Sequence, residues 1–195
     1  MGLALCAAAV SVAAGSTSDA RADEVYWTPK ALLKDFFPRS EKVTYLSLEI
    51  AGHRGLIEKQ LGYTPPKPKY VIFVAKTGEH IDGYAVIDEE LGQHEPITFG
   101  VKLSATGTVE RTEVMAYRER YGSEIREARF RQQFTGKSST DAIRAGDDVV
   151  VISGATISSK SITIGVRRAV ALVSVLLRDS QPTLTAARFA SSGPS

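Results

Sequence analysis

The sequence feature that most constrains the fold is a long helical pattern near the C-terminal end of the chain. Between Ile157 and Arg178, apolar residues recur at spacings of three, four and seven positions, including Ile162, Val166, Ala169, Val170, Val173 and Leu177. These spacings place the apolar side chains along one face of an α-helix. A helix with one apolar face must bury that face against another layer of structure.

The sequence upstream of this helix is rich in strand patterns. Alternating or β-branched apolar residues predict strands at 43–50, 70–75, 81–87, 97–104 and 109–117. Gly78 and the sequence Ala105-Thr106-Gly107 are turn signals between neighbouring strands. Thr28-Pro29 predicts the start of an N-terminal helix, and Gly62 predicts the end of a short second one. We therefore expect an α+β fold, a small antiparallel sheet or half-barrel with helices packed on it and the long helix last.

Two further segments lie between the last predicted strand and the long helix. Residues 124–134 are heavily charged and have a helical pattern. Residues 148–152 form an apolar run that predicts a strand buried on both faces. The sequence therefore predicts a buried strand that leads through a short turn into the long helix.

That turn, Ser153-Gly154-Ala155-Thr156, is the stretch with the clearest chemical meaning. A tight turn of small residues before a helix presents backbone N–H groups and the positive end of the helix dipole, which favours an anion such as phosphate. Gly154 allows a close backbone approach because it has no Cβ. The same residues also suit a plain helix cap without any ligand, since Ser and Thr are good N-caps. From the residues alone, both interpretations stay open.

Composition excludes several classes of function. The chain has 195 residues, a net charge of +2, one cysteine and three histidines that lie far apart, His53, His80 and His94. One cysteine excludes a disulfide framework and any multi-cysteine metal or iron–sulfur site. The near-neutral charge and the scattered basic residues argue against nucleic acid as a partner, and no catalytic constellation is visible. We expect no metal and no nucleic acid.

The two ends of the chain differ from its body. Residues 3–15 are apolar and are followed by Ala20-Arg21-Ala22, which predicts a signal peptide at 1–22 and a periplasmic or extracytoplasmic protein. No Lys or Arg precedes the apolar run, so an uncleaved membrane anchor is the alternative. Cys6 lies inside the leader, and cleavage would leave no cysteine. The last residues, 181–195, have a composition typical of a flexible tail.

The sequence SGATISS at 153–159 resembles the SGAT-x-[ST] signature of the FMN-binding domain family. Such domains occur in flavin-carrying subunits of the Na⁺-pumping NADH:quinone oxidoreductase, of ferredoxin:NAD oxidoreductases, and in exported FMN-binding proteins. The resemblance implies FMN held by a phosphoester bond to Thr156. It also implies, as partners, a flavin transferase that uses FAD as donor and membrane or exported redox proteins.

Further blocks extend the resemblance over about residues 80 to 178. They are 96–99, MAYRERYG at 115–122, and RFRQQFTGK at 129–137. The implied FMN-binding residues are Ser153, Gly154, Ala155, Thr156, Ser158, Glu119, Gly122, Gln133 and Lys137. From the residues alone, the charged side chains of 117–131 also fit a solvated helix face. Tyr117 and Tyr121 could stack on a flavin ring or pack in the core.

The residue patterns and the resemblance together divide the chain into a signal peptide at 1–22, an N-terminal helix and strand lead-in at 23–79, an FMN-binding domain at 80–180 and the tail. It departs from the family at one position: the usual Asp three residues before Ser153 is Val150. It therefore supports FMN binding more strongly than covalent attachment. The expected function is an electron carrier, with an FMN-dependent reductase of a small acceptor and a non-flavinylated binding module as alternatives. Whether the chain is an enzyme stays open.

Overall fold

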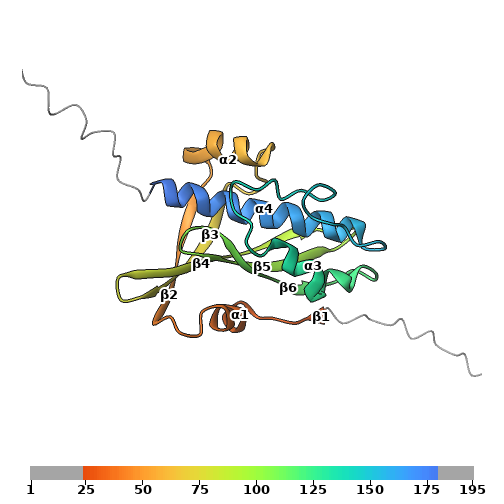
Figure 1. Ribbon diagram of the computed structural model, residues 1–195, viewed down its shortest axis with the longest axis horizontal. Helices are drawn as coiled ribbons and strands as arrows, with labels where there is room; N and C mark the ends of the chain where they lie inside the picture. The colour runs from red at the N-terminus through yellow and green to blue at the C-terminus, as the bar shows by residue number, and fades with distance from the viewer. Residues whose placement is uncertain (1–23, 180–195) are drawn as a thin grey trace, which may run out of the picture.

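The fold is α+β, as the sequence predicts, and a six-stranded antiparallel sheet forms its centre (Figure 1). The computed structural model describes residues 24–179, so the predicted signal peptide and tail lie outside the described residues. The sheet is open and has the order β1-β6-β5-β4-β3-β2. Its strands are β1 (Glu24–Val25), β2 (Lys42–Glu49), β3 (Lys69–Thr77), β4 (His80–Leu91), β5 (Pro96–Ser104) and β6 (Val109–Tyr117).

Helices cover both faces of this sheet. Figure 1 shows α1 (Pro29–Phe36) on one face, and α2 (Arg54–Leu61) together with the long α4 (Thr156–Asp179) on the other. The remaining helical segments are short: η1 (Ala51–His53), η2 (Ser123–Arg126), α3 (Ala128–Arg131) and η3 (Gln132–Phe134). No helix among residues 24–179 combines the length and the apolar character that a membrane span requires.

The ends of the first two helices follow from local chemistry. Thr28 precedes α1, and its hydroxyl accepts a hydrogen bond from the amide of Ala31 at 3.2 Å, while Pro29 occupies the first turn. Gly62 follows α2 with a φ of 77°, a left-handed conformation that glycine adopts at little cost. Both ends lie where the sequence predicts them.

The alternation of side chains along the strands produces two separate cores. In β5, the alternate residues Ile97, Phe99, Val101 and Leu103 are fully buried and belong to the main core with α2 and α4. A smaller core on the opposite face contains Leu32 and Phe36 of α1 together with Met115 of β6. The long helix therefore buries its apolar face against the sheet, as its sequence pattern requires.

The prediction of a strand at 148–152 is wrong. This segment is irregular, with only an isolated bridge between Ala145 and Val149, and the side chain of Val150 is 72% exposed. The backbone of Val150 instead pairs with the side-chain amide of Gln133, which donates to the carbonyl at 3.2 Å and accepts from the N–H at 2.8 Å. A side chain thus takes the place of a neighbouring strand.

The single helix predicted at 124–134 is also wrong. The segment is divided into η2, α3 and η3, because Glu127 adopts an extended conformation with φ −62° and ψ 140° between the first two. Phe130 and Phe134 nevertheless pack edge to face in the main core, with ring centroids 5.5 Å apart. The helical spacing of the sequence reports these two buried aromatic residues rather than a continuous helix.

Candidate functional site

The turn that precedes α4 presents an exposed hydroxyl at the start of a long helix. Gly154 has a φ of 85°, a left-handed conformation, and a Cβ at this position would meet no atom within 4 Å. The amide of Ala155 donates to the carbonyl of Ile152 at 3.0 Å and closes the turn. Thr156 is the first residue of α4 and is exposed, and its hydroxyl makes only a long contact of 3.5 Å to the carbonyl of Ile152.

No side chain within residues 24–179 caps the N-terminus of α4. Ala155, the residue before the helix, has no side-chain acceptor. Within residues 24–179, no group accepts a hydrogen bond from the backbone amides of Thr156, Ile157 or Ser158. These amides and the positive end of the helix dipole therefore point to a place that suits an anion. The interpretation of the turn as a plain helix cap has no capping hydrogen bond to support it.

Three of the expected site residues, Ser158, Gly122 and Ala155, pack together at this turn. Ser158 is buried, and its hydroxyl lies 2.9 Å from the hydroxyl of Tyr117, which also donates to the carbonyl of Tyr121. Gly122 has a φ of 94°, and a Cβ there would lie 2.6 Å from the Tyr117 hydroxyl and 3.0 Å from that of Ser158. The buried Ala155 is the next neighbour. Gly122 is therefore required by close packing against α4.

Gln133 lies on the other side of the turn and positions the segment that leads into it. Its amide group holds both backbone groups of Val150. A cavity of about 480 Å³ opens here, lined by Arg129, Phe130, Gln133, Val150, Val151, Ile152 and Ser153. The structure therefore brings Gln133 and Ser153 to one cavity beside the exposed Thr156 hydroxyl.

Lys137 is not placed at the turn. Its ammonium group lies 2.7 Å from the carboxylate of Asp148, which also accepts hydrogen bonds from the amides of Ile143 at 3.0 Å and Arg144 at 2.7 Å. Burial raises the pKa of Asp148, but Lys137 and the two amides outweigh it and hold the pKa below its usual range. Lys137 and Asp148 thus fix the loop that contains residues 143–148.

We expect Asp148→Asn to destabilise the protein by about 1 kcal/mol at neutral pH, because it loses charged hydrogen bonds. A carboxylate with a lowered pKa stabilises the fold above its unfolded pKa of about 4, and this stabilisation disappears as pH falls through the folded pKa. Urea unfolding should therefore show a gap between variant and parent that closes on acidification. Asp147→Asn, at an exposed neighbour, is the control. A gap that is independent of pH would contradict this role of Asp148.

Glu119 is buried and supports the loop between β4 and β5. One of its carboxylate oxygens accepts hydrogen bonds from the amides of His94 at 2.5 Å and Glu95 at 3.0 Å. Burial raises the pKa of Glu119, but these amides outweigh burial and the pKa lies below its usual range. Glu119 therefore remains ionised at neutral pH. It lies just after β6 and orders the loop that leads into β5.

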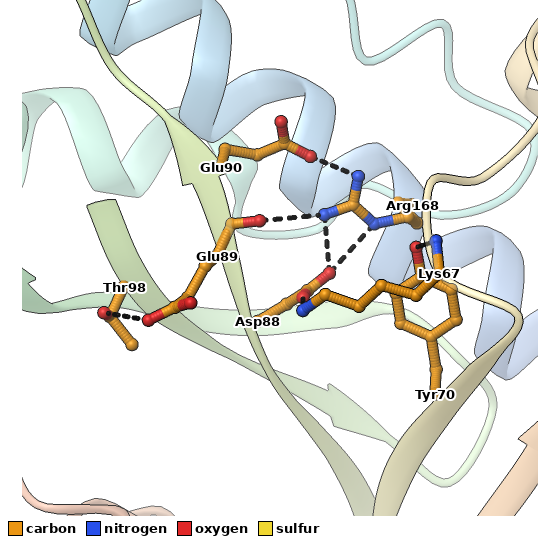
Figure 2. Close-up of polar contacts among 7 residues, drawn as sticks. All are labelled: Lys67, Tyr70, Asp88, Glu89, Glu90, Thr98 and Arg168. Carbon is orange, nitrogen blue, oxygen red and sulfur yellow. Dashed lines mark hydrogen bonds and ion pairs between the residues drawn. The ribbon is translucent and has the colours of Figure 1, made fainter. Parts of the chain in front are cut away.

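Sequence reasoning missed the contacts that fix α4 on the sheet. Figure 2 shows Arg168 of α4 bound to two acidic residues of β4, and its guanidinium donates to Asp88 at 2.9 and 2.5 Å and also to Glu90. Lys67 reaches the second oxygen of Asp88 at 2.6 Å. Burial lowers the pKa of Arg168, but Asp88 and Glu90 outweigh burial and raise it above its usual value. The only sequence signal is an arginine within the apolar stripe of the helix.

Comparison with known proteins identifies the part of the chain that carries this site. Residues 92–171 match the family model described as the FMN-binding domain. The matched segment begins in the loop after β4 and includes β5, β6, the turn before α4 and two thirds of that helix. The match shows an FMN-binding domain in this segment, which makes up less than half of the chain. The search of curated proteins gave no match.

In the described part of the chain, no group of three or more His, Cys, Asp or Glu residues is arranged to hold a metal ion. An organic cofactor such as FMN supplies redox chemistry that side chains alone do not have. The family match and the open helix N-terminus therefore point to the same kind of ligand, a phosphate-bearing flavin.

Proposed function

We propose that the chain is an exported flavoprotein that carries FMN on Thr156 through a phosphoester bond and transfers electrons between membrane or exported redox partners. The observation that carries this proposal is the exposed Thr156 hydroxyl at an uncapped helix N-terminus inside the FMN-binding segment. When bound, FMN supplies one- and two-electron redox chemistry, and the protein sets its position and its surroundings.

The residues around Thr156 fit an attached phosphate. A phosphodiester retains one negative charge, which the unpaired amides at the start of α4 can bind. The left-handed Gly154 leaves the approach to these amides open. A transferase must also reach the hydroxyl, and Thr156 is exposed, whereas Ser158 is buried against Tyr117. These differences favour Thr156 over Ser158 as the attachment point.

The surface around the turn also suits a flavin ring. Tyr121 and Val150 are 75% and 72% exposed, and Ile157 is 46% exposed, although all three have large apolar side chains. Apolar side chains that face water at a site are typical of contacts with a ligand or partner. Together with the adjacent cavity of about 480 Å³, they offer apolar contacts to a ring held at Thr156.

The decisive experiment is the intact mass of the full chain after coexpression with a flavin transferase. We expect a yellow protein, heavier than the unmodified chain by one FMN less one water. Thr156→Ala should lose this mass completely, because it removes the only atom that could form the bond at this residue. Ser158→Ala is the matched control, since it removes the neighbouring hydroxyl of the same signature, and it should keep the mass.

Three results would contradict parts of this proposal. A mass increase that survives Thr156→Ala but disappears in Ser158→Ala would move the attachment to Ser158. An unmodified chain that still binds FMN reversibly would show that the protein binds FMN without a covalent bond. Val150→Asp would then test whether the missing Asp prevents attachment. Steady turnover of a small acceptor by the isolated flavoprotein would favour a reductase over a carrier.

A further inference from the structure

A second pocket is lined by residues of α4, of the segment after α2 and of the loop after η3. Figure 1 shows where these three elements lie. It has a volume of about 290 Å³ and is lined by Tyr63, Ile143, Arg144, Ala145, Lys160, Thr163, Ile164 and Arg167. None of these residues belongs to the expected FMN-binding set. Seven of the eight lining residues lie inside the segment that matches the FMN-binding domain, and Tyr63 precedes it.

The charges in this pocket are all positive. Arg144, Lys160 and Arg167 line it, and across residues 24–179 none of the three side chains forms an ion pair with a carboxylate. Arg167 donates only to the carbonyl of Gln60, at 2.5 Å. Burial, together with the nearby charge of Arg144, lowers the pKa of Arg167 and outweighs the opposite effect of Tyr63 and the Asp148 carboxylate. Asp148 is already paired with Lys137, so the three lining cations leave an excess of positive charge that favours an anion.

Part of the remaining lining is apolar, and one of its residues has a strained backbone. Ile143 is buried and adopts a φ of 44°, which is rare for a β-branched residue and strains the backbone. Ile164 is 42% exposed, and Ala145 completes the apolar wall. Burial raises the pKa of Tyr63 more than the nearby Arg168 guanidinium lowers it, so the Tyr63 hydroxyl stays protonated at the pocket wall.

We infer that this pocket binds a phosphate monoester with a small apolar body. The doubly charged phosphate lies between Arg144, Lys160 and Arg167, and the apolar body packs on Ile143 and Ile164. A phosphate matches three cations better than a singly charged carboxylate does, and arginine can bind it through two parallel hydrogen bonds. Inorganic phosphate alone would leave the apolar wall without contacts, so the ligand also has an apolar part. This inference does not depend on flavin attachment at Thr156.

Calorimetric titration of the full chain with phenyl phosphate tests this inference. We expect saturable binding that is at least about tenfold tighter than that of inorganic phosphate or benzoate, because each of these lacks one half of the contacts. The double variant Arg144→Gln/Lys160→Gln removes two exposed cations without opening the core, and it should weaken phenyl phosphate binding about tenfold or more. Lys30→Gln/Arg39→Gln makes the same change in charge on the opposite face and should bind as the parent does.

Several outcomes would overturn the inference. Equal affinity in the two double variants would show that phenyl phosphate binds elsewhere or only through net charge. Inorganic phosphate or benzoate binding as tightly as phenyl phosphate would remove the apolar or the phosphate half of the proposed ligand. A titration of the chain that carries flavin separates the two sites: unchanged affinity supports a distinct pocket, whereas loss of binding would show that the flavin itself occupies it.

Discussion

Arg168→Met is expected to lower the free energy of unfolding by about 3–5 kcal/mol, because it leaves buried carboxylates without their partner. The Arg168 side chain is 1% exposed and that of Asp88 is 2% exposed. Because methionine keeps much of the volume of arginine, the lost stability arises from the unpaired carboxylates rather than from a cavity. Lys67 still reaches Asp88, but within the described contacts only Arg168 binds the carboxylate of Glu90. Urea unfolding followed by circular dichroism measures the change.

Two further variants show whether the loss arises from the buried network. Arg178→Met removes an exposed arginine from the same helix and should change the stability by less than about 0.5 kcal/mol. Arg168→Met combined with Asp88→Asn and Glu90→Gln removes the unpaired charges and should recover part of the lost stability. Equal losses in Arg168→Met and Arg178→Met would refute the role assigned to this network.

Gly165→Ala should also destabilise the protein, by about 1–3 kcal/mol, although alanine is the better helix former. An added Cβ would lie 2.1 Å from Cζ of Phe99 and within 2.8 Å of two further ring atoms. Phe99 is fully buried in β5, so its ring has no free space and α4 must move away from the sheet. The melting temperature should fall accordingly.

A second substitution tests whether this contact is the cause. Phe99→Leu removes the ring atoms that an alanine at 165 would strike, so the double variant should be more stable than the sum of the single effects predicts. The absorbance spectrum of each variant, recorded after coexpression with a flavin transferase, should show whether flavin incorporation falls when α4 is displaced. A Gly165→Ala variant as stable as the parent would mean that helix and sheet are packed less closely than the structure shows.

The sequence predicts those parts of this fold that are governed by periodicity. The apolar alternation in β5 and the helical spacing in α4 each arise from one buried face, which is visible within a single segment. The irregular segment at Val150 could not be predicted in this way. Its apolar run resembles a strand, but its backbone pairs with the side chain of Gln133, seventeen residues away in the sequence.

The resemblance names residues that lie together at the turn, such as Gly122 and Ser158, because close packing there leaves a glycine in the motif. That these residues bind FMN stays a prediction. The resemblance could not show that Lys137 binds Asp148, or that Glu119 holds the loop at His94 and Glu95. Such contacts depend on the placement of whole elements, which no local pattern encodes.

The Arg168 network also bears on what can be separated from this chain. Arg168 lies inside the segment that matches the FMN-binding domain, whereas its acidic partners Asp88 and Glu90 precede that segment. A fragment cut at residue 92 would keep a buried cation, lose its counter-charges and expose the hydrogen-bonding edge of β5. We therefore expect that a fragment starting at residue 92, where the family match begins, would not fold stably by itself.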